Sequence, residues 1–268
     1  MYLVDYHTHT RCSPDSAASL PDMVRAAQQA GLRELCTTDH CDLQQADGSP
    51  LGAWDWGPIL GQFEEAGFFQ YREDFRLLLG LELGGGYTDP RRAEEILAAA
   101  PLDFVIGSVH NLSPALGGGD LFFMDYQSER VCRQVLEDYL SSLYQLARQS
   151  CYDSLGHIIY PLRYINGRGG RRMTLEPWAE QLDLVLRAVI DGGRAIEVNT
   201  HAGRELEDWR FILQRYRKLG GELVTLGSDA HRPDQVAGGL ARAARLLQDT
   251  GFRWVTVYRR RKPEQRRL

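Results

Sequence analysis

The strongest constraint on the fold of this chain is a regular alternation of short apolar runs with segments of helical pattern. Apolar runs typical of strands lie at residues 2–4, 35–38, 75–81, 104–109, 154–156, 195–199, 223–227 and 254–257. Helical patterns lie between them, at 19–30, 59–71, 90–100, 127–149, 175–191, 205–219 and 233–248. This alternation, without a linker or a short repeat, is typical of an α/β protein with a parallel sheet.

The number of strand–helix units indicates how the sheet is arranged. Seven or eight units in 268 residues favour a closed barrel of the TIM kind. An open, doubly wound sheet is the alternative, and it usually carries a glycine-rich nucleotide turn after an early strand. Residues 84–86 are three glycines after a strand, but they lack the G-x-G-x-x-G spacing, so a loop that needs backbone freedom is the better interpretation. We therefore expect a single barrel domain.

Side chains able to bind metal lie at the C-terminal ends of these apolar runs. They are His7, His9, Asp39, His40, Glu82, His110, His157, Asn199, Asp229 and His231. Residues two apart on a strand point to the same side, so His7 and His9 can share one ion. The C-terminal strand ends of a barrel meet on one face, and imidazoles with carboxylates are ligands of Zn, Mn and Fe. Six of the seven histidines follow this pattern and none lies inside a predicted helix, which favours metal binding over histidines placed for packing.

The same residues carry a resemblance to a known family. H-x-H-T at residues 7–10, T-D-H at 38–40, G-L-E at 80–82, G-S-V-H at 107–110, G-H at 156–157 and S-D-A-H at 228–231 resemble, in this order, the PHP (polymerase and histidinol phosphatase) superfamily. The resemblance covers nearly the whole chain. It implies an α/β fold, a distorted (β/α)7 TIM-like barrel, with a di- or trinuclear centre of two or three divalent metal ions (Zn, Mn or Fe). We expect this domain to span residues 1–258, with 259–268 as a basic C-terminal tail in solvent.

The resemblance divides the predicted metal ligands into three sets. His7, His9, Glu82 and Asp229 would hold one ion. Glu82 would bridge to a second ion, held also by His110 and His157. Asp15, His40 and His231 would hold a third ion, and Asp15 departs here from relatives that place a histidine at this position.

Within the superfamily, D-Y-H-T-H-T at residues 5–10, S-x-D-S at 13–16 and E-V-N-T at 197–200 most resemble the free-standing histidinol-phosphate phosphatases. This implies hydrolysis of L-histidinol phosphate to L-histidinol and phosphate, a step of histidine biosynthesis, through a metal-bridging hydroxide. Clustered ions suit the reaction because they neutralise a phosphate dianion and lower the pKa of a bridging water. The implied catalytic residues are Glu82, Asp229 and His231. His201, the one histidine outside the metal motifs, is a candidate general acid or an ordinary polar loop residue.

Arginines after the fifth and sixth strands grip the phosphate in these enzymes, and the matching positions here are Arg163 and Arg204. Asn199, at the end of the sixth strand, is the third predicted substrate-binding residue. The planar fork of arginine can donate two hydrogen bonds to one phosphate. Each arginine could instead belong to the solvated surface, in which case the basic loop 168–172 is the alternative grip. Aromatic residues of the two irregular segments are candidates for a lid over the substrate: Trp54, Trp56 and Phe68, or Phe122 and Phe123.

Composition restricts the class of binding partner and the cellular compartment. The formal net charge of −5 gives no case for nucleic-acid binding, and no apolar run has membrane-spanning length. No signal peptide is recognisable, and five cysteines without C-x-x-C spacing indicate reduced thiols in a cytoplasmic protein. We therefore expect a small-molecule phosphate ester as the partner and leave the oligomeric state open. The alternatives are a PHP phosphoesterase for a phosphotyrosine protein, a sugar phosphate or a nucleotide phosphate, a nuclease, and a metal-binding protein without activity.

Overall fold

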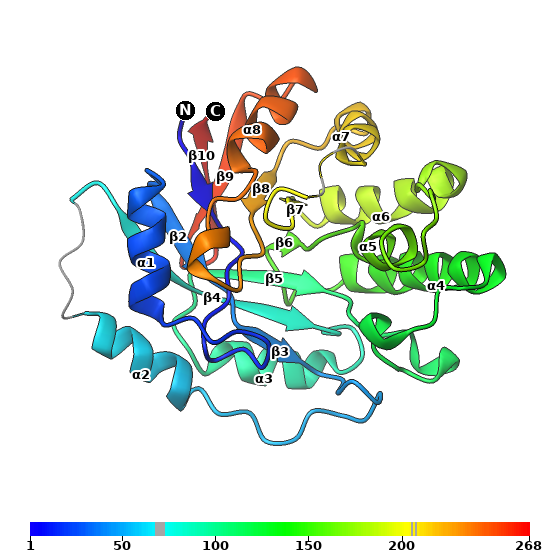
Figure 1. Ribbon diagram of the computed structural model, residues 1–268, viewed down its shortest axis with the longest axis horizontal. Helices are drawn as coiled ribbons and strands as arrows, with labels where there is room; N and C mark the ends of the chain where they lie inside the picture. The colour runs from blue at the N-terminus through cyan, green and yellow to red at the C-terminus, as the bar shows by residue number, and fades with distance from the viewer. Residues whose placement is uncertain (68–72, 205, 207) are drawn as a thin grey trace.

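Parallel strands curl into a barrel in the computed structural model, which describes residues 1–67, 73–204, 206 and 208–268 (Figure 1). The strands of its wall, in spatial order, are β1 (Val4–Asp5), β2 (Glu34–Thr37), β4 (Arg76–Gly84), β5 (Phe104–Ser108), β6 (Ser154–Leu155), β7 (Ala195–Asn199) and β8 (Val224–Gly227). A short strand, β3 (His40–Asp42), continues the direction of β2 and pairs with β4. The order of the strands in space follows their order in the chain, as in a barrel wound in one direction.

The two edge strands, β1 and β8, meet and close the barrel. The backbone N–H of Tyr6 donates to the carbonyl of Leu226 at 2.9 Å, and that of His9 donates to the carbonyl of Ala230 at 2.8 Å. Asp5 reinforces this seam, because its carboxylate accepts from the backbone N–H of Ser228 at 2.9 Å and from the Ser228 hydroxyl at 2.6 Å. The predicted distorted (β/α)7 TIM-like barrel is thereby confirmed.

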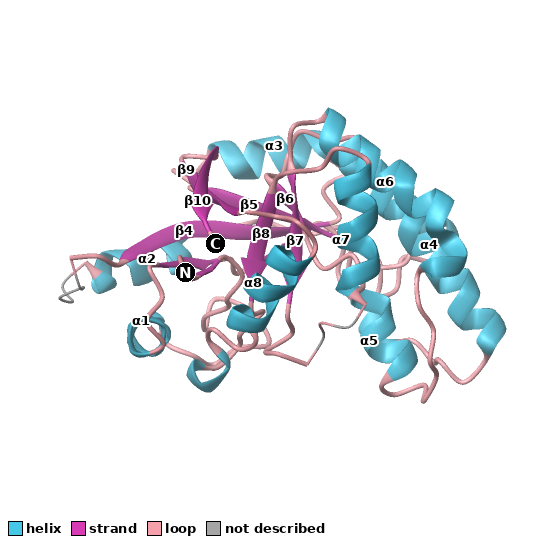
Figure 2. Ribbon diagram, turned by 90° about the horizontal axis from the view of Figure 1, so that it is seen from above, coloured by secondary structure: helices cyan, strands magenta, loops and turns pink. Residues whose placement is uncertain are grey.

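Helices cover the outside of the sheet, each between two successive strands (Figure 2). They are α1 (Leu20–Gln29), α2 (Gly57–Ala66), α3 (Pro90–Ala98), α4 (Glu129–Ala147), α5 (Tyr160–Asn166), α6 (Ala179–Asp191), α7 (Trp209–Lys218) and, after the last barrel strand, α8 (Leu240–Asp249). Ser19 caps α1 by accepting from the N–H of Asp22, and Asp89 caps α3 by accepting from the N–H of Arg92. Among the described residues, no helix has the length and apolar character to cross a membrane.

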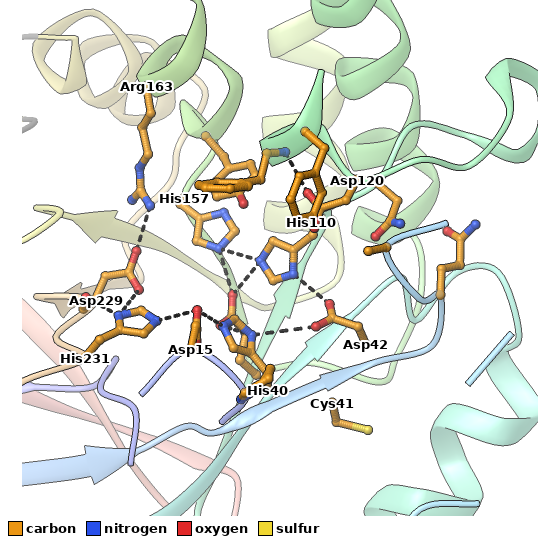
Figure 3. A pocket seen from close by; sticks show the side chains of 18 of the residues that line it. Asp15, His40, Cys41, Asp42, His110, Asp120, His157, Arg163, Asp229 and His231 are labelled. Carbon is orange, nitrogen blue, oxygen red and sulfur yellow. Dashed lines mark hydrogen bonds and ion pairs between the residues drawn. The ribbon is translucent and has the colours of Figure 1, made fainter. Parts of the chain in front are cut away.

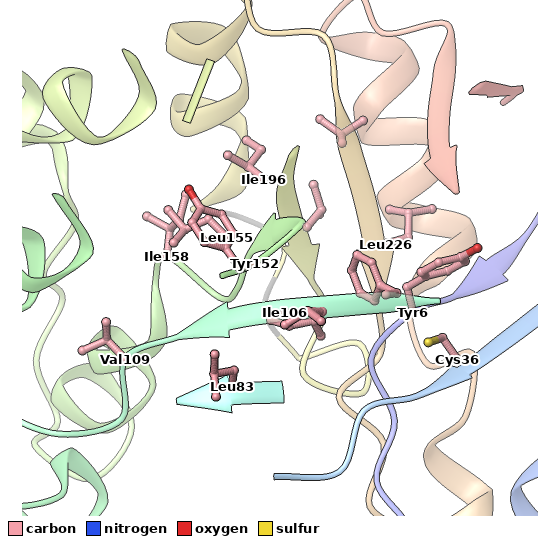
Figure 4. Packing of buried hydrophobic residues seen from close by; sticks show 14 of the residues in the cluster. Tyr6, Cys36, Leu83, Ile106, Val109, Tyr152, Leu155, Ile158, Ile196 and Leu226 are labelled. Carbon is pink, nitrogen blue, oxygen red and sulfur yellow. The ribbon is translucent and has the colours of Figure 1, made fainter. Parts of the chain in front are cut away.

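Apolar side chains fill the space inside the sheet and between the sheet and the helices (Figure 4). Because a parallel sheet is covered on both faces, its strands are continuous apolar runs. Phe104, Val105 and Ile106 of β5 are fully buried, as are Leu81 and Leu83 of β4. This core fixes the directions of the strands and therefore the positions of the side chains at their C-terminal ends.

Some predicted helices have different bounds in the structure. The predicted helix 59–71 corresponds to α2, which ends at Ala66. Residues 68–71 of the predicted range lie outside the described residues. The predicted helix 233–248 divides into a 3-10 turn (Pro233–Gln235) and α8, because Gly239 has a φ of 77° and begins α8 as its N-cap. The predicted helix 205–219 begins as α7 only at Trp209, with 205 and 207 outside the described residues. Helix α5 was not predicted.

The basic segment 259–268 is not a solvated tail, and this prediction is wrong. Lys262–Arg267 forms β10, which pairs antiparallel with β9 (Trp254–Arg259). Arg259 contacts both carboxylate oxygens of Glu34, and Arg261 contacts Asp153 at 3.0 Å. Glu34 begins β2, and Asp153 directly precedes β6. The arginines are therefore counterions for acidic groups at the N-terminal end of the barrel, opposite the strand ends that carry the histidines.

Candidate metal centre

The C-terminal ends of the barrel strands surround a cavity of about 780 Å³ (Figure 3). Its wall includes Arg163 and two aromatic rings of α5, Tyr160 and Tyr164. It also includes seven of the nine predicted metal ligands: Asp15, His40, Glu82, His110, His157, Asp229 and His231. His7 and His9 lie behind this wall and are fully buried. All predicted metal ligands thus meet in one place, although they come from six different strand ends and the loop that holds Asp15.

Four ligand atoms form a compact group at the seam between β1 and β8. The Nε2 atom of His7 lies 3.1 Å from the Nε2 atom of His9, 3.1 Å from an oxygen of Glu82 and 3.4 Å from Oδ1 of Asp229. The Nε2 atom of His9 lies 3.5 Å from the same Glu82 oxygen and 3.4 Å from Asp229 Oδ1. Tetrahedral zinc with bonds of 2.0–2.1 Å separates its ligands by about 3.3 Å. The His7 and His9 nitrogens therefore lie at the spacing of one such ion, both from each other and from the Glu82 and Asp229 oxygens.

The second oxygen of Glu82 belongs to a neighbouring group. Glu82 Oε1 lies 2.7 Å from Nε2 of His157 and 3.1 Å from Nε2 of His110, and the two nitrogens are 3.3 Å apart. Glu82 is fully buried, with one oxygen facing each group. A carboxylate in this position can bridge two ions.

A third group lies nearer to solvent. Asp15 Oδ2 is 3.0 Å from Nε2 of His231 and 3.5 Å from Nε2 of His40, and the Asp15 side chain is 52% exposed. The rings of His40 and His231 both stack on that of His9. This group is more open than the other two, because Asp15 comes from a loop and not from a strand end.

In most of these imidazoles, the Nδ1 atom lies within hydrogen-bond distance of an acceptor. Nδ1 of His7 lies 2.7 Å from Glu197, and Nδ1 of His110 lies 2.6 Å from Asp42. Nδ1 of His9 lies 3.0 Å from the Ser13 hydroxyl, which donates to Asp39. An acceptor at Nδ1 leaves the lone pair of Nε2 directed at the centre, as metal-binding histidines require. The donor set and its orientation fit divalent ions such as Zn, Mn or Fe.

Glycines make room for two of these contacts. A Cβ at Gly227 would clash with Glu197 and with His7, and a Cβ at Gly84 would clash with Asp42. No site role was predicted for Glu197, Asp42 or Ser13. The available signals were spacing and context: Asp42 is two residues after His40 on one strand, and Glu197 is a carboxylate inside a buried apolar run.

The pKa values of the cluster are shifted because its carboxylates and imidazoles lie close together. Burial lowers the pKa of His7, but Glu197, Glu82 and Asp229 outweigh it and raise the pKa well above its ordinary value. Burial and the neighbouring His40 lower the pKa of His9 to about 3. Burial raises the pKa of Glu82, but the surrounding histidines outweigh it and hold the pKa well below its usual range. The carboxylates therefore favour positive charge at this site, as protons on some imidazoles or as bound cations.

Arg163 and Asn199 form a polar contact beside the cluster. Arg163, on α5, donates to Asp229 Oδ2 at 2.8 Å and to Asn199 Oδ1 at 2.7 Å, and its side chain is 6% exposed. Asn199 is fully buried and lies behind the cavity wall, where it also accepts from the N–H of His201 at 2.9 Å. Asn199 therefore orients Arg163 in this arrangement, and its predicted direct contact with substrate stays a prediction.

His201 and Arg204 lie on the rim of the cavity, farther from the cluster. Both line the cavity, and the exposed Arg204 donates to the carbonyl of His201 at 3.1 Å. His201 has a φ of 45°, in the left-handed region. The structure thus brings Arg163 to the metal ligands, whereas Arg204 is exposed and His201 half-buried.

The aromatic residues predicted as a lid fall into different places. Trp54, Phe122 and Phe123 line the cavity. Trp56 is buried against α3, where its Nε1–H donates to the carbonyl of Ile96 at 3.0 Å, and Phe68 lies outside the described residues. Trp54 and the 3-10 turn at Leu121–Phe123 therefore contribute to the apolar part of the cavity wall.

Known proteins share this arrangement of sequence and fold. Residues 5–201 match the PHP domain family, and the chain belongs to that family. The "Histidinol-phosphatase" of Lactococcus lactis subsp. lactis is 28% identical over 265 residues, which are 96% of this chain and 95% of that protein. A Deinococcus radiodurans protein named "Probable histidinol-phosphatase" is 29% identical over 269 residues, with 97% and 98% coverage.

A solved structure supports the fold independently. It is the crystal structure of histidinol phosphate phosphatase from Lactococcus lactis complexed with Zn, L-histidinol and phosphate. Its TM-score to this structure is 0.82 at 23% identity, and the match covers 97% of this chain and 98% of that one.

Proposed function

We propose that this protein is a metal-dependent phosphomonoesterase that hydrolyses L-histidinol phosphate to L-histidinol and phosphate. The observation that carries the proposal is the cluster of three ligand groups, two of which share Glu82, with Arg163 donating to Asp229 at its edge. Relatives over nearly the full length are named histidinol-phosphatases, and the Lactococcus lactis structure was solved with Zn, L-histidinol and phosphate. The five free cysteines fit a reducing, cytoplasmic setting for this step of histidine biosynthesis.

The proposed metal ligands are the nine residues that the structure brings together: His7, His9, Asp15, His40, Glu82, His110, His157, Asp229 and His231. Two or three divalent ions bound there would neutralise the phosphate dianion and lower the pKa of a water between them. Asp42 and Glu197 would hold the imidazoles in the required tautomer.

The protein's own groups would complete the charge balance around phosphorus. Arg163 is almost buried, so its charge acts through a medium of low polarity on the non-reacting phosphate oxygens. Arg204, at the rim, would approach the phosphate from the solvent side. His201 lies on the same rim, where it could give a proton to the departing alcohol oxygen.

The test is release of phosphate from a substrate panel by the purified chain loaded with Zn, Mn or Fe. The panel contains L-histidinol phosphate, a phosphotyrosine peptide, a sugar phosphate and a nucleotide. We expect the highest kcat/KM for L-histidinol phosphate and loss of activity after dialysis against a chelator. A higher kcat/KM for any other panel member would refute the assigned substrate, and activity unaffected by the chelator would refute the metal requirement.

A further inference from the structure

The carboxylates that line the cavity differ in what they contact. They are Asp15, Asp42, Glu82, Asp120 and Asp229. Four of them contact a histidine or an arginine within the metal cluster. Asp120 contacts neither: its Oδ1 accepts from the backbone N–H of Phe122 at 2.7 Å, and its Oδ2 has no hydrogen-bond partner among the described residues. Asp120 therefore presents a carboxylate oxygen to the cavity that the metal cluster does not use.

The backbone fixes this carboxylate beside the second ligand group. Asn111 and Asp120 form an antiparallel bridge, and the N–H of Leu121 donates to the carbonyl of His110 at 2.8 Å. Asp120 therefore lies opposite Asn111, the residue that directly follows the proposed metal ligand His110. Figure 3 shows Asp120 and Arg163 on opposite sides of His110 and His157. A phosphate held near Arg163 and the metal ligands would point its ester substituent toward Asp120.

The surroundings of Asp120 suit an organic cation. Phe122 and Trp54 line the same cavity, as do Tyr160 and Tyr164. Aromatic rings attract cations through their faces and also hold flat rings. Arg168 of the neighbouring loop is engaged elsewhere: it donates to the carbonyl of Phe122, and its guanidinium lies over the rings of Phe122 and Tyr164.

We propose that Asp120 is the specificity-determining residue of a leaving-group subsite, which binds the positively charged nitrogen of an amino-alcohol phosphate. This rests on the proposed function, since L-histidinol carries such a nitrogen next to the alcohol carbon. The subsite would select substrates by charge at one end of the cavity, while phosphate recognition takes place at the other. Phosphate esters with uncharged leaving groups would still reach the metal ligands but would gain nothing from Asp120.

The test compares two aspartate variants that change charge equally. Asp120→Asn removes the charge and keeps an oxygen for the Phe122 N–H. Asp125→Asn is the matched control, because Asp125 forms the same kind of turn by accepting from the N–H of Gln127 at 3.0 Å but is exposed and does not line the cavity. The readout is the ratio of kcat/KM for L-histidinol phosphate to kcat/KM for p-nitrophenyl phosphate, with metal content measured in each protein.

We expect Asp120→Asn to lower this ratio roughly 10- to 100-fold, the range for loss of one hydrogen bond to a charged group, and Asp125→Asn to leave it unchanged. Inhibition of p-nitrophenyl phosphate hydrolysis by L-histidinol should weaken by the same factor. An unchanged ratio in Asp120→Asn, or an equal fall in Asp125→Asn, overturns the proposal.

Failure of the proposed function has a separate signature. If the wild-type protein hydrolyses p-nitrophenyl phosphate but not L-histidinol phosphate, the assigned substrate is wrong. The subsite is then judged with O-phosphoethanolamine against ethyl phosphate. A preference for the ammonium ester that disappears in Asp120→Asn supports the subsite, and the absence of a preference in the wild type overturns it.

Discussion

Replacing Arg259 by alanine should destabilise the fold without changing the metal centre. Arg259 contacts both oxygens of Glu34, whose side chain is fully buried, and also donates to the hydroxyl of Tyr6 at 3.1 Å. Removing one partner of a buried ion pair costs about 3–5 kcal/mol, because the other charge stays buried. Tyr2 and Tyr6 still donate to Glu34 in the variant, which places the expected loss at about 3 kcal/mol. For a chain of this size, Tm should fall by roughly 6–12 °C.

The control lies in the same hairpin. Arg266 pairs with Glu264, and both side chains are more than one-third exposed, at 35% and 41%. Arg266→Ala should cost less than about 1 kcal/mol, as exposed ion pairs do. The assays are thermal and urea unfolding, with metal content and kcat/KM measured on the folded variants. If Arg259→Ala and Arg266→Ala lose the same stability, the hairpin does not anchor the barrel as described.

The stability lost in Arg259→Ala should depend on pH in a defined direction. Burial raises the pKa of Glu34, but hydrogen bonds from Arg259, Tyr6 and Tyr2 outweigh it and leave the pKa below its ordinary value. A lowered folded-state pKa contributes stability above the unfolded-state pKa and loses it as the pH falls through the folded-state value. The difference between wild type and Arg259→Ala should therefore be largest near neutral pH and should narrow in acid. A difference that grows in acid would contradict the role assigned to Glu34.

Three further predictions concern the cavity. Glu82→Gln should lower metal content by at least one ion per chain, since one carboxylate faces two ligand groups, and elemental analysis with unchanged metal content would contradict this. Burial lowers the pKa of His40 and His110, but Glu82 and other nearby carboxylates outweigh it and raise both well above the ordinary value, so the metal-free protein holds protons there at pH 7. Zinc binding should release those protons and tighten as the pH rises, and calorimetric heats that are the same in buffers of different ionisation enthalpy would show otherwise. Arg163→Ala should keep its metals but lose roughly 10²- to 10³-fold in kcat/KM, with weaker inhibition by phosphate, and normal phosphate inhibition would remove Arg163 from the site.

The barrel and its metal-binding face could be predicted because both follow from local rules. An apolar run bounded by turns predicts a strand, and parallel strands must bring their C-terminal ends to one face. Glu82 illustrates this: it continues an apolar run, so its position in the cavity follows from β4 alone. The division of these side chains into three ligand groups, with Asp15 from a loop, came from the family resemblance and not from local rules.

Other features depend on distant partners and had no local signal. Arg163 lies on α5, a helix of 7 residues that begins with proline in its first turn and is too short for a clear period. Glu197 could be recognised as unusual in a buried run, but its partner His7 is 190 positions away. The run of arginines near the C-terminus was predicted to be solvated. The carboxylate that pairs with Arg259 belongs to Glu34, 225 positions away in the sequence. Local charge patterns cannot distinguish solvent from a counterion so far along the chain.

The closure of the barrel at β1 and β8 makes the proposed metal ions part of the chain's connectivity. His7 and His9 lie on one side of this seam and Asp229 on the other, next to the Asp5–Ser228 contact, which joins residues 223 positions apart. An ion bound by all three would act as a reversible cross-link around most of the chain, and cross-links that close long loops remove the most entropy from the unfolded state. Stability would then rise with the logarithm of the free metal concentration, as for any ligand that binds only the folded form. Without the proposed ions, the barrel would be least stable at this seam.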